Sequence, residues 1–150
     1  TVVEVNAARK KAMAEKVIAA MGGDVKGKTI GVLGLAFKQN TDDMRDAPSL
    51  DIIPALQAAG AKIRAYDPEA MDEAAHLLSD IEFAKSAYDA VQDADAMVII
   101  TEWDQFRALD FERIKEALST NIVVDLRNIY SPDDMAARGF KYTSIGRPSI

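Results

Sequence analysis

The sequence predicts an α/β fold: a doubly wound, mostly parallel six-stranded sheet with helices on both faces and a helix ahead of the first strand. Residues 29–35, 96–101 and 121–126 form largely apolar runs, which are typical of parallel strands buried on both faces. Stretches with helical spacing of apolar residues separate the strand-like runs, and the connections are long enough for right-handed crossovers. Together these patterns indicate a Rossmann-like sheet.

The N-terminal helix should follow Asn6, whose side chain is a good N-cap, and cover residues 7–21. Gly22 and Gly23 end it. Its basic side is best interpreted as a solvated face. The basic residues are Arg9, Lys10, Lys11 and Lys16, and the apolar residues expected to face inward are Ala8, Ala12, Met13, Val17, Ile18 and Met21.

The helix after the first strand should start near Asp46 and Pro48 and end at Gly60. Pro54 removes one backbone donor from it, so we expect a kink or a new start near Leu50. The residues predicted on its inner face are Leu50, Ile52, Ile53, Leu56 and Ala59.

A strand at 61–66 should end at Asp67–Pro68, because proline takes the chain out of regular pairing. The helix predicted next, at 69–78, should turn its apolar residues inward, namely Met71, Ala74, Ala75, Leu77 and Leu78. The remaining expected elements are a strand at 81–84, a helix at 86–92, a strand at 96–101, a helix at 111–118, a strand at 121–126, a helix at 131–138 and a strand at 140–145.

Composition argues against several classes of function. A net charge of -6 and a pI near 4.8 disfavour nucleic acid or an anionic membrane as partner, since both require a basic face. Without cysteine, and with His76 as its one histidine, the chain offers no disulfide, cysteine nucleophile or zinc site of its own. No apolar run approaches the roughly 20 residues of a membrane helix, and no signal-peptide core is visible, so we expect a soluble, cytoplasmic domain.

Charge is concentrated directly after the first strand, within the stretch Thr29–Pro48. A simple turn would use Gly, Asn and Ser, so this density of charge indicates a site. In doubly wound sheets, ligands bind beyond the C-terminal ends of the strands. The polar clusters expected there are Phe37 and Lys38 with residues 42–45, then Glu102–Asp104, and then Arg127 and Asn128.

A dinucleotide site is suggested by Gly31 and Gly34, with Asp67 at the end of the second strand where a ribose-binding acid would lie. The motif G-x-G-x-x-G is nevertheless absent, and bulky side chains stand at Phe37 and Lys38, where a pyrophosphate would have to touch backbone. A nucleotide diphosphate, bound by free amides at the helix side with Lys38 and Arg127, fits better than NAD bound by this chain itself.

Simpler interpretations of these residues stay open. Phe37 could be a core aromatic, Lys38 a surface cation, and Asp42 with Arg45 a local ion pair. Trp103 could plug the sheet end, and His76 is best interpreted as structural or exposed. Asp42 and Asp43 are sequence neighbours whose side chains should point apart, so neither is assigned a catalytic role.

Five motifs, in order along the chain, resemble the C-terminal domain of the UDP-glucose/GDP-mannose dehydrogenase family. They are GVLGLAFKQNTDDMRDAPSLDII, GAKIRAYDP, VIITEWDQF, VVDLRNIY and GFKYTSIGR. Family members oxidise the C6 hydroxyl of a nucleotide sugar to a carboxylate in two NAD-dependent steps. NAD sits on an N-terminal domain, a catalytic cysteine and lysine follow it, and the C-terminal domain closes over the nucleotide of the substrate.

The resemblance implies that residues 1–24 are a helix continuing from a central segment outside this chain, and that 25–150 form the UDP-sugar-binding domain. It implies a homo-oligomeric enzyme whose NAD-binding domain lies outside this chain, and TEWDQF favours UDP-glucose over GDP-mannose. By motif position, Phe37 and Lys38 would contact the UDP-sugar, Arg127 would hold its nucleotide end, Arg45 would reach the NAD pyrophosphate, and Asp42 and Asp43 would order the loop and orient Arg45.

Two alternatives remain open. One is a non-catalytic nucleotide-binding or assembly module of the same fold, using the basic helix at 7–21 as its contact face. The other is the corresponding domain of a GDP-mannose or UDP-N-acetylhexosamine dehydrogenase.

Overall fold

The computed structural model describes the backbone of residues 2–145 and the side chains of residues 11–145, and it contains one six-stranded sheet. The strand order is β3-β2-β1-β4-β5-β6, and every pair of neighbouring strands is parallel. The predicted doubly wound sheet is therefore confirmed, as fully parallel in the described residues. The strands are β1 (Thr29–Leu33), β2 (Lys62–Tyr66), β3 (Ile81–Phe83), β4 (Ala96–Ile99), β5 (Ile122–Asp125) and β6 (Lys141–Ser144).

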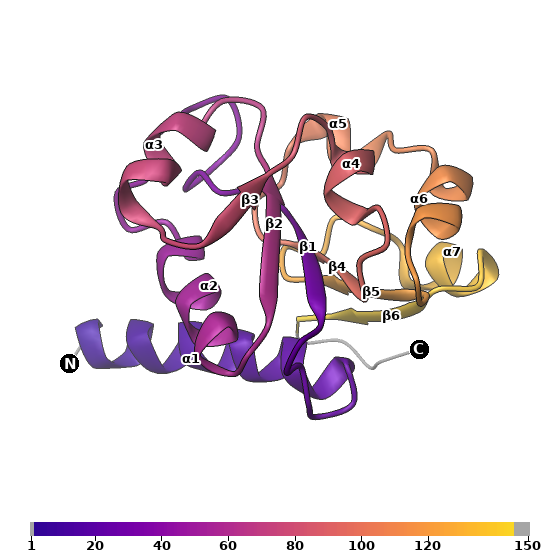
Figure 1. The fold of residues 1–150 in the computed structure, drawn as a ribbon, viewed down its shortest axis with the longest axis horizontal. Coiled ribbons are helices and arrows are strands. Elements are labelled where there is room, and N and C mark those ends of the chain that lie inside the picture. The colour runs from indigo at the N-terminus through magenta and orange to yellow at the C-terminus, as the bar shows by residue number, and fades with distance from the viewer. Residues whose placement is uncertain (1, 146–150) are drawn as a thin grey trace.

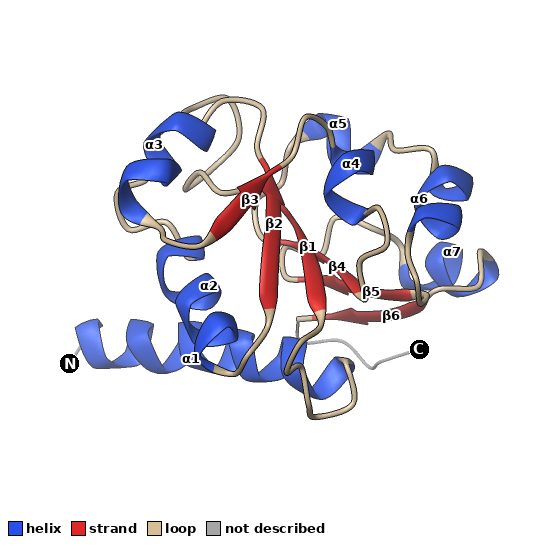
Figure 2. Ribbon diagram, in the orientation of Figure 1, coloured by secondary structure: helices blue, strands red, loops and turns tan. Residues whose placement is uncertain are grey.

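Helices cover both faces of this sheet (Figure 1, Figure 2). Strand order reverses between β1 and β4, so the two halves of the chain wind onto opposite faces. One face carries α1 (Val2–Ala20), α2 (Ser49–Ala58) and α3 (Met71–Leu77). The other carries α4 (Ala87–Val91), α5 (Asp104–Arg107), α6 (Phe111–Ala117) and α7 (Pro132–Ala137).

The sheet separates two hydrophobic cores, because successive strand residues point to opposite faces. In β4, Val98 belongs to the core under α1–α3, whereas Met97 and Ile99 belong to the core under α4–α7. All three side chains are fully buried, and each such burial stabilises the fold by about 1.5–3 kcal/mol. Gly31 in β1 permits the close approach of α4, since a Cβ there would lie 2.7 Å from the Ala90 carbonyl oxygen.

Helix α1 packs on its own domain, beside α2 and against β5 (Figure 1). Its residues Ala14, Val17 and Met21 are buried in the first core. The predicted N-cap at Asn6 is wrong, because the helix begins at Val2 and runs through Asn6. Ala12, predicted to face inward, is exposed, while the side chains of Ala8, Arg9 and Lys10 lie outside the described residues.

Helix α2 is continuous from Ser49 to Ala58, so the predicted new start near Leu50 is wrong. Pro54 lies on its exposed side, where water can bond to the Leu50 carbonyl that lacks a helical partner. Three other apolar residues that were predicted to face inward are exposed, namely Ala59, Ala75 and Leu77. Helix α5 was not predicted. None of the described helices is both long and apolar enough to cross a membrane.

Candidate functional site

The three polar clusters predicted at strand ends are connected at one edge of the sheet, where β1, β4 and β5 end. Gln39, after β1, accepts a hydrogen bond from the Asp104 amide through its side-chain oxygen, at 3.1 Å. Glu102, after β4, pairs with Arg127, after β5, at 2.9 Å. These two contacts link the segments that follow β1, β4 and β5 across the point where strand order reverses.

Asp67 fixes the beginning of the loop after β1. Its fully buried carboxylate accepts hydrogen bonds from the Leu35 amide at 2.7 Å and the Ala36 amide at 3.0 Å through Oδ2. Through Oδ1 it accepts from the amides of Glu69 and Ala70, each at 2.8 Å. A carboxylate has about four acceptor positions, so these four amides satisfy the buried charge.

This arrangement explains why the dinucleotide pattern fails. In a dinucleotide-binding sheet, the loop amides after the first strand face a pyrophosphate, and an acid after the second strand faces a ribose. Here the amides of Leu35 and Ala36 donate to Asp67 itself. The acid and the loop amides therefore satisfy each other, and Asp67 is a structural residue.

Free amides at the start of α2 were predicted to bind a diphosphate, but two of the amides there are already used. Pro48 contributes no amide, and the Leu50 and Asp51 amides donate to the carbonyls of Ala47 and Pro48. The prediction is therefore wrong for Leu50 and Asp51, because the chain tightens into a turn immediately before the helix.

Phe37 and Lys38 emerge from the loop into solvent. Phe37 is 46% exposed, one of two large hydrophobic side chains that are exposed in the described part of the chain, so its interpretation as a core aromatic is wrong. Lys38 is exposed as well. The Phe37 amide donates to the Asp43 carbonyl at 2.8 Å, which closes the segment 37–43 into a compact loop. The loop thus exposes an aromatic ring and a cation at consecutive positions.

Arg45 and Asp43 form a two-bond fork, with Nε to Oδ1 and NH2 to Oδ2 both at 3.1 Å. The Arg45 side chain is 90% exposed, so its guanidinium still faces solvent. The hydrogen bonds from the Arg45 side chain and backbone lower the pKa of Asp43, and this fork raises the pKa of Arg45. Asp42 was the suggested partner of Arg45, but its exposed carboxylate makes no ion pair in the described region.

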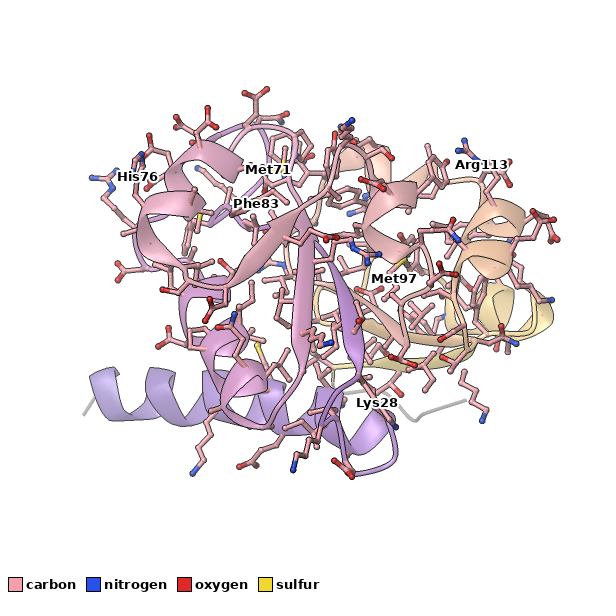
Figure 3. All side chains as sticks on the ribbon, in the orientation of Figure 1. Lys28, Met71, His76, Phe83, Met97 and Arg113 are labelled. Atoms are coloured by element: carbon pink, nitrogen blue, oxygen red, sulfur yellow. The ribbon has the colours of Figure 1, made fainter. Side chains whose placement is uncertain are left out.

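An open groove of about 670 Å³ lies beside this fork, between residues 41–45 and helix α3. Leu50, Leu77 and Glu73 line its α2 and α3 sides. Leu77 is 56% exposed, which makes one wall of the groove apolar. His76, also on α3, points away into solvent, as expected (Figure 3).

Glu102 lies between two arginines. Its Oε1 is 2.9 Å from Arg127 NH2, and its Oε2 is 3.7 Å from Arg107 NH2. Arg107 also donates to the Ile129 carbonyl at 3.3 Å, so it ties α5 to the segment after β5. Sequence reasoning missed Arg107, because α5 is too short to produce a periodic pattern.

Two other residues of these clusters have structural positions. Trp103 is buried in the second core, as expected of a plug at the sheet end, and its indole Nε1 has no partner among the described residues. Asn128 pairs with the backbone of Ile145, donating to its carbonyl at 3.1 Å and accepting from its amide at 3.0 Å. Within the described residues, no group of His, Asp and Glu side chains is arranged to hold a metal ion.

Comparison with known proteins identifies close relatives of the chain. Residues 31–132 match the model of the UDP-glucose/GDP-mannose dehydrogenase family, UDP binding domain. UDP-glucose 6-dehydrogenase of Rhizobium meliloti is 56% identical over 99% of this chain and 34% of its own length. UDP-glucose 6-dehydrogenase TuaD of Bacillus subtilis is 43% identical over 99% of this chain and 32% of its own length. The chain thus spans about a third of these relatives.

Solved structures of two nucleotide-sugar dehydrogenases are also similar to the chain. The NDP-N-acetyl-D-galactosaminuronic acid dehydrogenase of Methanosarcina mazei has a TM-score of 0.84 and 27% identity, over 96% of this chain and 30% of that one. A UDP-glucose dehydrogenase of Pyrobaculum islandicum has a TM-score of 0.73 and 28% identity, over 90% of this chain and 29% of that one.

Proposed function

Because the chain belongs to the UDP-glucose/GDP-mannose dehydrogenase family, we propose that it is the UDP-sugar-binding domain of a UDP-glucose 6-dehydrogenase. The reaction proposed for the whole enzyme is the NAD-dependent oxidation of UDP-glucose to UDP-glucuronate. The observation that carries the proposal is the match of residues 31–132 to the UDP binding domain, with Phe37, Lys38 and Arg127 inside that range. Relatives called UDP-glucose 6-dehydrogenase at 56% and 43% identity favour UDP-glucose as the substrate.

In this proposal the edge where β1, β4 and β5 end binds the nucleotide sugar. Lys38 and Arg127 provide charge-assisted hydrogen bonds to the sugar hydroxyls and the diphosphate, and Phe37 provides an exposed ring for apolar contact. Glu102 keeps Arg127 in place through the pair at 2.9 Å. On a chain of net charge -6, these two cations would offer a local positive site for the negative charge of the diphosphate.

NAD would accept the hydride that leaves C6 of the sugar. The residues of this chain fit a contact to NAD but not a complete site for it, since the Asp67 carboxylate and its loop amides satisfy each other. Arg45 is the residue that fits, because Asp43 orients a guanidinium that remains 90% exposed. Asp42 and Asp43 then order the loop that carries Arg45. A domain outside this chain would hold most of the cofactor.

The chain has no cysteine, so a covalent intermediate on sulfur requires a residue outside it. We therefore expect this chain alone to be inactive as a dehydrogenase and to bind UDP weakly, as part of a cytoplasmic, homo-oligomeric enzyme. Ala14, Val17 and Met21 attach the apolar side of α1 to its own sheet, so an assembly module would have to use the opposite, basic side of the helix.

Calorimetric titration of the chain with UDP and, separately, with NAD tests the proposal. We expect a weak UDP isotherm and no measurable heat from NAD. Tight NAD binding without UDP binding would show that the chain is a cofactor domain and contradict the proposal. Ultracentrifugation that found a tight dimer unaffected by UDP, together with an absent UDP isotherm, would instead support an assembly module.

A further inference from the structure

The dipeptide Leu35–Ala36, directly before Phe37, has all four of its backbone polar groups held by buried side chains. Asp67 accepts hydrogen bonds from both amides, at 2.7 and 3.0 Å. The Ser49 hydroxyl donates to the Leu35 carbonyl at 2.7 Å, and the Thr101 hydroxyl donates to the Ala36 carbonyl at 2.6 Å. The backbone at this point can therefore neither rotate nor shift without breaking buried hydrogen bonds.

The three side chains come from three different elements. Ser49 begins α2, Asp67 follows β2, and Thr101 follows β4, so the contacts join both halves of the sheet at the point of strand reversal. Ser49 and Asp67 are 0% exposed and Thr101 is 1% exposed. Gly34 permits this approach, because a Cβ there would lie 2.5 Å from the Thr101 Cβ.

Burying a polar side chain costs free energy, and the buried polar side chains of this chain are concentrated around Leu35–Ala36. A buried hydroxyl or carboxylate loses its hydration, and that loss must be offset by well-formed hydrogen bonds. Five polar or charged residues are classed as buried in the described part of the chain, and three of them hold this one dipeptide. A loop that only connected β1 to α2 could leave these backbone groups to water, as most surface loops do.

We propose that Ser49, Asp67 and Thr101 are positioning residues that fix the backbone from which Phe37 and Lys38 project. This inference rests on the proposed function for the role of those two side chains in binding the UDP-sugar. Fixing the loop before the ligand arrives removes the entropy loss of ordering it on binding, so the contribution appears as UDP affinity. The three residues themselves lie behind the loop and are not proposed to touch the ligand.

The most direct test replaces Thr101 in the chain and measures UDP affinity by NMR titration. Thr101→Val keeps the shape but removes the hydroxyl, and we expect UDP affinity to fall about fivefold, as for the loss of one hydrogen bond. Thr101→Ser retains the hydroxyl and should restore affinity to within about twofold of wild type. Thr120→Val is the matched control, because the Thr120 hydroxyl donates to the Asp95 carbonyl at the opposite edge of the sheet.

A second pair of variants covers the case in which Thr101→Val does not fold. Ser49→Ala removes the bond to Leu35, and Ser119→Ala removes a similar bond, from the Ser119 hydroxyl to the Ala94 carbonyl, far from the loop. Hydrogen exchange of the Phe37 amide provides a readout without ligand. We expect the Phe37 amide to exchange faster in Thr101→Val and Ser49→Ala than in their controls. The comparison is made after exchange rates are corrected for any difference in global stability.

The possible outcomes test the positioning role and the proposed function separately. Wild-type UDP affinity and unchanged Phe37 exchange in Thr101→Val and Ser49→Ala would overturn the positioning role while leaving the proposed function intact. Absence of UDP binding by the wild-type chain would contradict the proposed function, and Phe37 exchange alone would then decide whether these residues fix the loop. Equal effects in the variants and their controls would show a role in global stability only.

Discussion

Arg127 is held 2.9 Å from Glu102, and this pair joins the segment after β5 to the segment after β4. The pair leaves the Arg127 side chain 34% exposed, so the guanidinium is both oriented and accessible. In the proposed function, this orientation by a carboxylate would prepare the Arg127 guanidinium for a diphosphate without burying it.

Replacing Arg127 by alanine should therefore weaken UDP binding. A charge-assisted hydrogen bond contributes about 1.5–3 kcal/mol, so we expect a loss of about tenfold or more in calorimetry. Arg138→Ala is the control, because Arg138 also pairs with a carboxylate, at 3.1 Å from Asp134, but caps the end of α7 and is not one of the proposed binding residues. Equal affinities for UDP in the wild type and Arg127→Ala would remove Arg127 from the site.

The Arg45–Asp43 fork predicts a specific titration. Because Arg45 lowers the pKa of Asp43 below 3.8, the fork is present at neutral pH and is lost only as the pH falls through that lowered value. Arg45→Ala should raise the Asp43 pKa toward 3.8, as measured by NMR of its carboxyl carbon. Lys38→Ala should raise it less, since Lys38 acts only through space. An Asp43 pKa that Arg45→Ala leaves unchanged would mean that the fork does not persist in solution.

Gly34 should be intolerant of any side chain. Its φ of 95° disfavours L residues, and an added Cβ would lie 2.6 Å from the Thr101 amide nitrogen. Gly34→Ala should lower the free energy of unfolding by more than about 2 kcal/mol in urea denaturation. Gly23→Ala separates the two causes, because Gly23 has a similar φ of 91° with nothing within 4 Å of the added Cβ. If both variants lost the same stability, the steric contact with Thr101 would be irrelevant.

The buried Tyr130 should make the stability of the fold decrease at alkaline pH. Burial, followed by the charge of Asp125, raises its pKa, so the folded state retains this proton after an unfolded chain has lost it. Its contribution is complete below about pH 10 and is lost as the pH rises above that value. Tyr130→Phe loses the hydrogen bond to the Phe106 carbonyl and should be about 1 kcal/mol less stable at neutral pH. The difference between variant and wild type should shrink above pH 10, and parallel stability curves would contradict this.

The sheet could be predicted because its information is local. Apolar runs such as 96–101 mark strands buried on both faces, and they need no knowledge of their neighbours. Local signals failed where a competing signal was stronger. Asn6 is a good N-cap, yet the residues before it continue the helix, and Pro54 costs little where its side of α2 faces water.

The site could be predicted only in part. The density of charge after β1 indicated where binding groups gather, but the role of Asp67 could not be predicted. Its position after β2 suggests a ribose contact, whereas its actual partners, Leu35 and Ala36, lie 32 and 31 residues earlier in the sequence. Thr101 and Ser49 likewise act through contacts that depend on the fold, and no sequence pattern marks them.

The central claim is that this chain binds the nucleotide of a UDP-sugar through the edge where β1, β4 and β5 end. Its most direct test is an amide-detected NMR titration of the chain with UDP, repeated with Lys38→Ala. We predict that the UDP-induced shifts gather at residues 37–45 and around Arg127, and that Lys38→Ala weakens binding without changing the unfolding midpoint, because Lys38 is exposed. UDP-induced shifts confined to other parts of the chain, or the same UDP affinity in Lys38→Ala as in the wild type, would contradict it.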